Sequence, residues 1–338
     1  MSAGPIRIGI AGAGFMGQTH ATCYGMIPGA QVVGISDVRP EQAAKLAQAA
    51  DARPFDTLDH LLDQTRVDAL DICLPTDLHE EAIYTAARRG VHCIVEKPIA
   101  PDAESARRVA GKIAGSKSIV MVAHVIRFWP EYEYLKDAVE AGSWGKLAAL
   151  ALTRVSPRPG WTSNNWILDP KRSGGALLEL HIHDSDYLRR LLGEPEGVDS
   201  CGVKIGGAWD YVSTNYRYPG MAVSALGGWN MPANMPFKMA YRATFEKALL
   251  DFDSTRTPTL LLYREGHDVE SPAAPRPNVV SARSIGNISG LDGYYNELRY
   301  FVDCVEKGIA PERSGVKDAV ATMELLQREI LSAEQKLH

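Results

Sequence analysis

The 338-residue sequence has few of the features that mark secreted, membrane or nucleic-acid-binding proteins. It contains only five cysteines, scattered along the chain, which fits buried thiols in a reducing compartment better than disulfides or a zinc site. No apolar run approaches the roughly 20 residues of a membrane span, and the first residues show no charged-then-apolar leader. The net charge of −5 comes with no basic stripe for a nucleic-acid backbone. We therefore expect a cytoplasmic protein with neither a membrane nor a nucleic acid as partner.

The sequence does have the composition of an ordinary globular protein, 45% hydrophobic and 23% charged, and the length for two domains. Over residues 1–123, strand-like segments alternate with helical segments, a pattern typical of a doubly wound parallel sheet. Between residues 198 and 263, six strand-like segments follow without intervening helices, which predicts a large, mainly antiparallel sheet. The fold class is therefore α/β, with a second domain of the α+β type over residues 124–312. A final helix, within 313–338, is expected to pack back on the first domain.

A glycine-rich turn follows the first strand at once. Residues 6–11 read as the strand, and Gly12, Gly14 and Gly17 open the next helix in the spacing G-x-G-x-x-G. These glycines permit a tight turn, close approach of a pyrophosphate, and close packing of helix on strand, in that order. This order predicts a Rossmann domain that binds a dinucleotide: a strand, the glycines, a helix, a second strand and then an acidic residue.

The acid, Asp37, stands about 20 residues past the last glycine, where a carboxylate can bind the adenosine ribose. It would repel the 2′-phosphate of NADP, so we expect NAD, although Arg39 could pair with that phosphate. The residues expected to bind the cofactor are Gly12, Gly14, Phe15, Met16, Gly17, Asp37, Arg39, Leu74, Pro75, Thr76, His79, Glu96 and Lys97.

Lys97 is the first candidate for chemistry. It follows the apolar strand 92–95 within Glu96-Lys97-Pro98, at the carboxyl edge of the sheet, where open α/β folds bind ligands. By itself this segment is equally consistent with a solvated ion pair that turns the chain before a proline.

A polar stripe on a later helix is the second candidate. Glu179, His183 and Asp186 fall at positions i, i+4 and i+7 of the predicted helix 175–192, so they share one face. This indicates a polar pocket, with a solvated face and an incidental histidine as the alternative. His181 and His183 diverge at i, i+2 and no further ligand is evident, so we expect no metal site.

Together these segments resemble the glucose-fructose oxidoreductase and inositol dehydrogenase family. The resemblance rests on the glycine motif, on Thr76-Asp-Leu-His79, on Glu96-Lys97-Pro98, on Trp166-x-Leu-Asp169-Pro170 and on residues 174–183, in the same order along essentially the whole chain. It implies catalysis by Lys97 and His183, with Glu179 at a position that the family usually fills with Asp. It also implies a homodimer or homotetramer formed through the second sheet.

The resemblance predicts an NAD-dependent dehydrogenase acting on a secondary hydroxyl of a sugar, an inositol or a sugar derivative. We expect His183 to act as general base, Lys97 to hold and polarise the hydroxyl, and Glu179 to orient the site. Two alternatives remain open: an NAD-using glycosidase that oxidises its substrate transiently, and a non-catalytic dinucleotide sensor. The residues expected to contact substrate are Lys97, Arg127, Trp161, Asn164, Asn165, Trp166, Glu179, His181, His183 and Tyr294.

Overall fold

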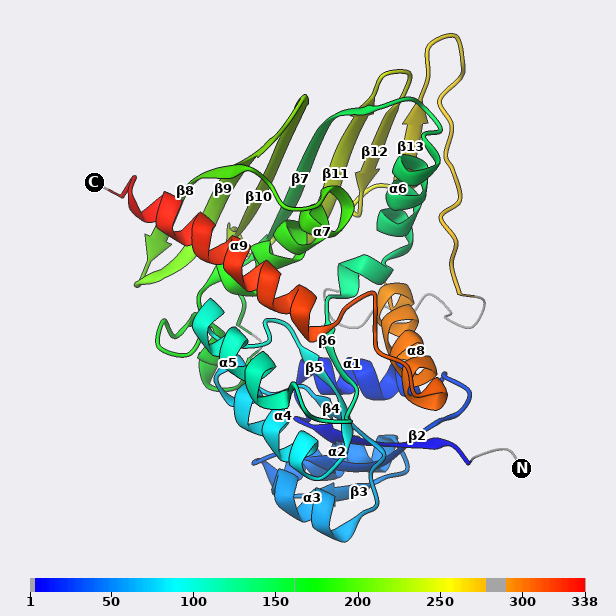
Figure 1. Cartoon of the computed structure of the whole chain (residues 1–338), viewed down its shortest axis with the longest axis vertical. Helices are drawn as coiled ribbons and strands as arrows, with labels where there is room; N and C mark the ends of the chain where they lie inside the picture. The colour runs from blue at the N-terminus through cyan, green and yellow to red at the C-terminus, as the bar shows by residue number, and fades with distance from the viewer. Residues whose placement is uncertain (1–3, 161, 278–289, 338) are drawn as a thin grey trace.

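A computed structural model describes residues 4–160, 162–277 and 290–337. The chain forms two domains, each built on one sheet, which lie one above the other in Figure 1. A parallel sheet comes first in the sequence and a mainly antiparallel sheet follows, so the expected fold class is confirmed.

The first sheet has six strands in the order β3-β2-β1-β4-β5-β6, all parallel. This order reverses between β1 and β4, the switch point at which doubly wound folds bind ligands. Its strands are β1 (Ile6–Ala11), β2 (Ala30–Ser36), β3 (Arg53–Phe55), β4 (Ala69–Ile72), β5 (His92–Glu96) and β6 (Val120–Ala123). Its helices are α1 (Phe15–Tyr24), α2 (Pro40–Ala49), α3 (Leu58–Gln64), the 3-10 turn η1 (Thr76–Leu78), α4 (His79–Arg88) and α5 (Ala103–Ile113).

Local signals account for several of these boundaries. Thr57 and Asp102 cap α3 and α5, because their side chains accept hydrogen bonds from the backbone N–H groups of His60 and Ser105. A capping side chain satisfies one of the N–H groups that the first turn of a helix leaves without a partner.

The second sheet has seven strands in the order β13-β12-β11-β7-β10-β9-β8, antiparallel except for the pair β7 and β10. Its strands are β7 (Leu147–Pro157), β8 (Gly197–Ile205), β9 (Ala208–Tyr218), β10 (Met221–Met231), β11 (Lys238–Phe245), β12 (Leu249–Asp253) and β13 (Leu260–Tyr263). The turn η2 (Val125–Phe128) and helix α6 (Pro130–Ala141) lead into it, and η3 (Ser163–Leu168), η4 (Leu177–His181) and α7 (Ile182–Leu192) follow β7.

One face of this sheet is covered by α6, α7 and the last helix (Figure 1). Tyr132 of α6 packs edge-on against Tyr187, Tyr241 and Phe252, with ring centroids 4.8 to 5.7 Å apart. On the other face, side chains such as Ala151, Ala222 and Thr244 are exposed. The expected dimer or tetramer through this face stays a prediction.

The last two helices connect the domains. α8 (Asp292–Lys307) packs on α1, and its Leu298 and Phe301 share a buried cluster with Ile8 and Ile10 of β1. It therefore joins the core of the first domain, although the expected domain boundary placed it in the second. α9 (Val316–Glu334) contacts α5 of the first domain and β8 and α7 of the second (Figure 1).

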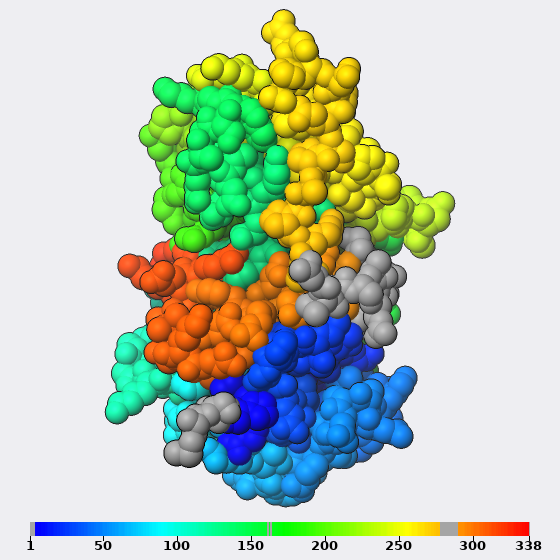
Figure 2. All heavy atoms as spheres, turned by 90° about the vertical axis from the view of Figure 1, so that its right-hand side faces the viewer, coloured from blue at the N-terminus to red at the C-terminus, as the bar shows by residue number. Residues whose placement is uncertain are grey.

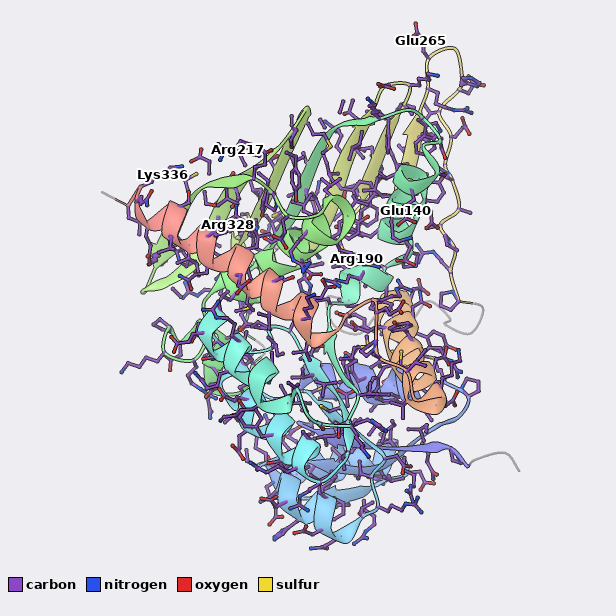
Figure 3. All side chains as sticks on the ribbon, viewed as in Figure 1. Glu140, Arg190, Arg217, Glu265, Arg328 and Lys336 are labelled. Atoms are coloured by element: carbon purple, nitrogen blue, oxygen red, sulfur yellow. The ribbon has the colours of Figure 1, made fainter. Side chains whose placement is uncertain are left out.

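The chain between β13 and α8 runs over the outside of the molecule. Glu265, just after β13, lies at the far tip of the second domain (Figure 3). From there the segment 266–277, gold in Figure 2, extends over the surface towards the first domain. Residues 271–277 have no regular structure, as expected, and 278–287 of the predicted loop lie outside the described residues. No helix among the described residues is long and apolar enough to cross a bilayer.

A buried ion pair holds η2 against α7 and supplies a test of the fold. The Arg127 guanidinium donates to both carboxylate oxygens of Asp186, at 2.7 and 2.6 Å, and both side chains are 1% exposed. We expect Arg127→Met to lower the free energy of unfolding by about 3 to 5 kcal/mol, because it leaves Asp186 buried without its cation.

Urea unfolding monitored by circular dichroism measures this loss. The control is Arg107→Met, which breaks the exposed pair between Arg107 and Glu324 of α9 and should cost less than about 1 kcal/mol. Equal losses for the two variants would contradict the structural role of the buried pair.

Candidate active site

A cavity of about 410 Å³ lies between the two domains. It opens along the carboxyl ends of β1, β2, β4 and β5 and reaches the ends of β7, β10 and β11. The predicted cofactor residues that line it are Gly12, Gly14, Phe15, Met16, Asp37, Arg39, Leu74, Pro75, Thr76, Glu96 and Lys97. Gly17 and His79 lie behind this wall.

The glycine turn fits a bound pyrophosphate. Gly12 has φ +103°, and a Cβ there would stand 2.4 Å from the Cys73 carbonyl oxygen, so the turn requires glycine. A Cβ at Gly17 would stand 1.9 Å from the Gly12 carbonyl oxygen, which fixes how closely α1 packs on β1. Around Gly14 no atom lies within 4 Å of the corresponding position, so the backbone there faces open space. This arrangement leaves a phosphate group free to approach the start of α1.

Asp37 and Arg39 form a clamp at the end of β2. Asp37 accepts hydrogen bonds from the backbone of Ala13 at 2.9 Å and from Nε and Nη2 of Arg39 at 2.9 and 3.0 Å. Burial opposes ionisation of Asp37, but the bonds from Arg39 and the backbone lower the pKa of its carboxyl. A carboxylate therefore faces the expected ribose position, and Arg39 is already paired.

Two histidines fix the loops that end β4 and β5. His79 lies between the carbonyl oxygens of Leu74 and Pro98, 2.8 Å from each. His20 lies between Asp71, at 2.8 Å, and Glu96, at 3.3 Å. Burial alone would lower the pKa of His20, but the charge of Asp71 raises it well above its ordinary value. Glu96 thus has a cationic partner, and its carboxylate accepts from the Lys97 backbone N–H at 3.2 Å.

Lys97 and Glu179 meet at the wall of the cavity. Lys97 Nζ donates to the carbonyl oxygen of Glu179 at 2.9 Å and to its Oε2 at 3.3 Å. The Thr76 hydroxyl donates to Oε1 of the same carboxylate at 3.0 Å, and Ser173 does so at 3.4 Å. Residues from both domains therefore hold the lysine ammonium in one place.

The helix that carries Glu179 is less regular than predicted. The expected helix 175–192 begins with a π-helical turn, η4, and continues as α7. Glu179 and His183 both line the cavity, but Asp186 is turned towards Arg127 and Thr322 instead. The predicted polar stripe therefore divides into two residues at the site and one in the ion pair behind it.

The surroundings of His183 favour its neutral form. Burial, together with the positive charges of Arg154 and Lys97, lowers its pKa well below the ordinary value. Its Nδ1 is buried without a hydrogen-bond partner among the described residues. A neutral imidazole at the cavity wall can accept a proton, as a general base must.

The other predicted substrate residues divide between cavity and core. Asn164, Trp166 and Tyr294 line the cavity, whereas Asn165 is exposed and does not. Trp161 lies outside the described residues.

Arg127 and His181 are buried away from the cavity wall. Arg127 is held by Asp186 and Asp318, and His181 Nε2 lies 3.0 Å from Glu329 of α9. Both side chains connect helices, so this placement gives no support for the predicted substrate contacts.

Arg154 is not among the residues predicted from the sequence. It lines the cavity although its side chain is only 2% exposed. A signal was present: Leu150, Leu152 and Arg154 alternate along β7, so the arginine occupies an inward register position where a buried charge needs partners. Further lining residues that the sequence analysis did not single out are Trp129, Trp229, Phe237 and Met239.

Comparison with known proteins agrees with this geometry. Residues 6–124 match the NAD-binding Rossmann domain of the oxidoreductase family GFO/IDH/MocA, and residues 132–250 match the C-terminal domain of the same family. The chain belongs to the GFO/IDH/MocA family. It is therefore an oxidoreductase with an NAD-binding domain, and the resemblance seen in the sequence is confirmed.

Relatives and solved structures extend over most of the chain. An inositol 2-dehydrogenase of Rhizobium meliloti is 28% identical over 98% of both chains. A UDP-N-acetylglucosamine 3-dehydrogenase of Acidithiobacillus ferrooxidans is 32% identical over 59% of this chain and 58% of that protein. A levoglucosan dehydrogenase in complex with NADH and levoglucosan has the same fold, with a TM-score of 0.85 at 20% identity over 98% of both chains.

The clamp at Asp37 predicts how cofactor preference can be changed. We expect Asp37→Ala to weaken NADH binding by about 10- to 100-fold, the scale of hydrogen bonds to a charged group. NADPH binding should strengthen, because the change removes the repelling carboxylate and frees Arg39 for the 2′-phosphate.

Nucleotide fluorescence titration measures both affinities without any substrate. Adding Arg39→Ala to the Asp37→Ala variant should abolish the gain for NADPH. A wild-type protein that binds NADPH tenfold more tightly than NADH would contradict the assignment.

Proposed function

We propose that this protein is an NAD-dependent dehydrogenase that oxidises a secondary hydroxyl of a sugar, an inositol or a related polyol. The observation that carries the proposal is the meeting of three features in one cavity: a glycine turn open to a pyrophosphate, a fixed lysine ammonium and a neutral histidine. Several relatives named as inositol dehydrogenases, one of them alignable over 98% of the chain, make cyclic polyols the first substrates to test.

In this proposal the residues divide the chemistry between them. Bound NAD would supply the acceptor for the hydride that leaves the carbinol carbon. The hydroxyl proton has to leave at the same time, and His183 accepts it because its imidazole is neutral. Lys97 holds the hydroxyl oxygen and stabilises the negative charge that develops on it. Glu179 orients the Lys97 ammonium through the two contacts described above.

A substrate panel tests the reaction class. NADH formation is followed with inositols, aldoses, anhydrosugars and glycosides, each with NAD in excess. Net NADH with at least one polyol or sugar supports the proposal. Release of the aglycone from a glycoside without net NADH would identify a glycosidase, and tight NAD binding without turnover of any compound would identify a sensor.

The two proposed catalytic residues should each be essential for turnover. We expect Lys97→Ala and His183→Ala to lower kcat by roughly 10²-fold or more, the scale of electrostatic and acid–base contributions. NADH affinity should change little, because neither variant alters the glycine turn. Near-normal turnover in His183→Ala, with an unchanged pH profile, would exclude His183 as the base.

The pH profile should show the environment of His183. Because burial and two nearby cations lower its pKa, His183 stays neutral as the pH falls through the ordinary histidine value of about 6.5. We expect kcat/KM for oxidation to stay level down to about that pH and to fall only at more acidic pH, where His183 binds a proton. Initial rates across the acidic range measure this, and a decline centred at or above about pH 6.5 would contradict it.

A further inference from the structure

The proposed reaction does not use Arg154, yet this residue is placed at the site. It lies near the end of β7 and lines the same cavity as His183 and Lys97. Its Nε and Nη2 donate to the two carboxylate oxygens of Asp184, at 3.2 and 2.8 Å, and Nη2 also donates to the Tyr132 hydroxyl at 3.2 Å. The guanidinium is therefore fixed in position on one side.

The other side of the guanidinium lacks an oxygen partner. Among the described residues, the one acceptor within hydrogen-bond distance of Nη1 is the sulfur of Met239, at 3.6 Å. A thioether is a weak acceptor, and Nη1 carries two hydrogens. Leaving such a buried donor unsatisfied is costly, so an oxygen brought in by a ligand would gain a charge-assisted bond there. Met239 also lines the cavity, so this donor lies at its wall.

The charges at the substrate end of the cavity cancel in pairs. Asp184 compensates Arg154, and Glu179 compensates Lys97. Arg172, which also lines the cavity, is paired with Asp77 at 3.1 Å. His183 adds no charge. Among the side chains that the structure describes, this end of the cavity therefore has donors for oxygen atoms but no unpaired cation to offset a carboxylate or phosphate on the substrate.

We propose that Arg154 is a specificity-determining residue, which donates a hydrogen bond from Nη1 to a non-reacting hydroxyl of an uncharged polyol. The inference rests on the proposed function for the location of the substrate. The substrate ring would then be held at two places. Lys97 and His183 contact the reacting hydroxyl, and Arg154 contacts another hydroxyl, so the ring has one orientation in the cavity. Trp166, Trp229 and Phe237 line the same cavity and can cover the apolar face of such a ring.

The test pairs a change in the protein with a change in the ligand. The probes are myo-inositol and its monodeoxy analogues, and calorimetry measures their affinity for the enzyme–NADH complex. The wild-type protein should bind the deoxy analogue that lacks the hydroxyl contacted by Arg154 about 10- to 100-fold more weakly than it binds myo-inositol. In Arg154→Lys, the single ammonium pairs with Asp184 and cannot also reach the ligand. This variant should bind that analogue and myo-inositol equally, while it still discriminates at the other positions.

The control variant is Arg66→Met, a change at an arginine that is 82% exposed in the first domain, which should match the wild type throughout. Unchanged discrimination at every ring position in Arg154→Lys would overturn the proposal, as would a wild-type complex that binds no polyol. Binding with the expected pattern but without NADH formation would refute the proposed function alone, so the two failures are distinguishable.

That the substrate is uncharged can be tested without any Arg154 variant. The wild-type complex should bind glucose at least about tenfold more tightly than glucuronate, because the three cations described at this end of the cavity, Lys97, Arg154 and Arg172, are already paired. Asp184→Asn leaves Arg154 uncompensated and should shift the ratio towards glucuronate. Tighter binding of glucuronate by the wild type would overturn the assignment of an uncharged substrate.

Discussion

The contact between Lys97 and Glu179 sets the geometry on which the site depends. Lys97 directly follows β5 of the first domain, and Glu179 belongs to the π-helical turn of the second. Because the ammonium donates to both the backbone carbonyl and the carboxylate of Glu179, its position is fixed by the second domain. Thr76 of the first domain binds the other carboxylate oxygen. This contact therefore joins the NAD-binding edge to the substrate pocket, and α9 also contacts both domains.

Glu179 stands at a position where the family resemblance leads us to expect the shorter Asp. The contacts of its carboxylate show what the longer side chain does here. A carboxylate offers about four acceptor positions, and Lys97, Thr76 and Ser173 already use three. The carboxylate is thus mainly occupied by the protein, which favours orientation of Lys97 over direct binding of a substrate hydroxyl. In the proposed reaction, donors such as Nη1 of Arg154 would then hold the other hydroxyls.

Local signals made most of the fold predictable, and long-range contacts limited the prediction of the site. The glycine turn, the caps at Thr57 and Asp102 and the alternation along the strands all lie within a few residues, so they could be seen in the sequence. The parallel pairing of β7 with β10 joins segments about 70 residues apart, so it could not be seen in the local sequence pattern. The same limit applies to Arg127, which was predicted to contact the substrate: the partners that bury it lie 59 and 191 residues further along the chain.

The π-helical turn shows this limit at the level of one element. Sequence periodicity predicts an ordinary helix, with Glu179, His183 and Asp186 on one face. The start of the segment is fixed at Gly175, where φ is +71° and a Cβ would stand 2.3 Å from the Trp209 carbonyl oxygen. Its end is fixed by the pairing of His181 with Glu329. A turn held at both ends takes up one extra residue by widening, a deformation common at functional sites. It leaves Glu179 and His183 at the cavity and directs Asp186 to Arg127, so tertiary contacts, and not the local pattern, decide which polar residues reach the substrate.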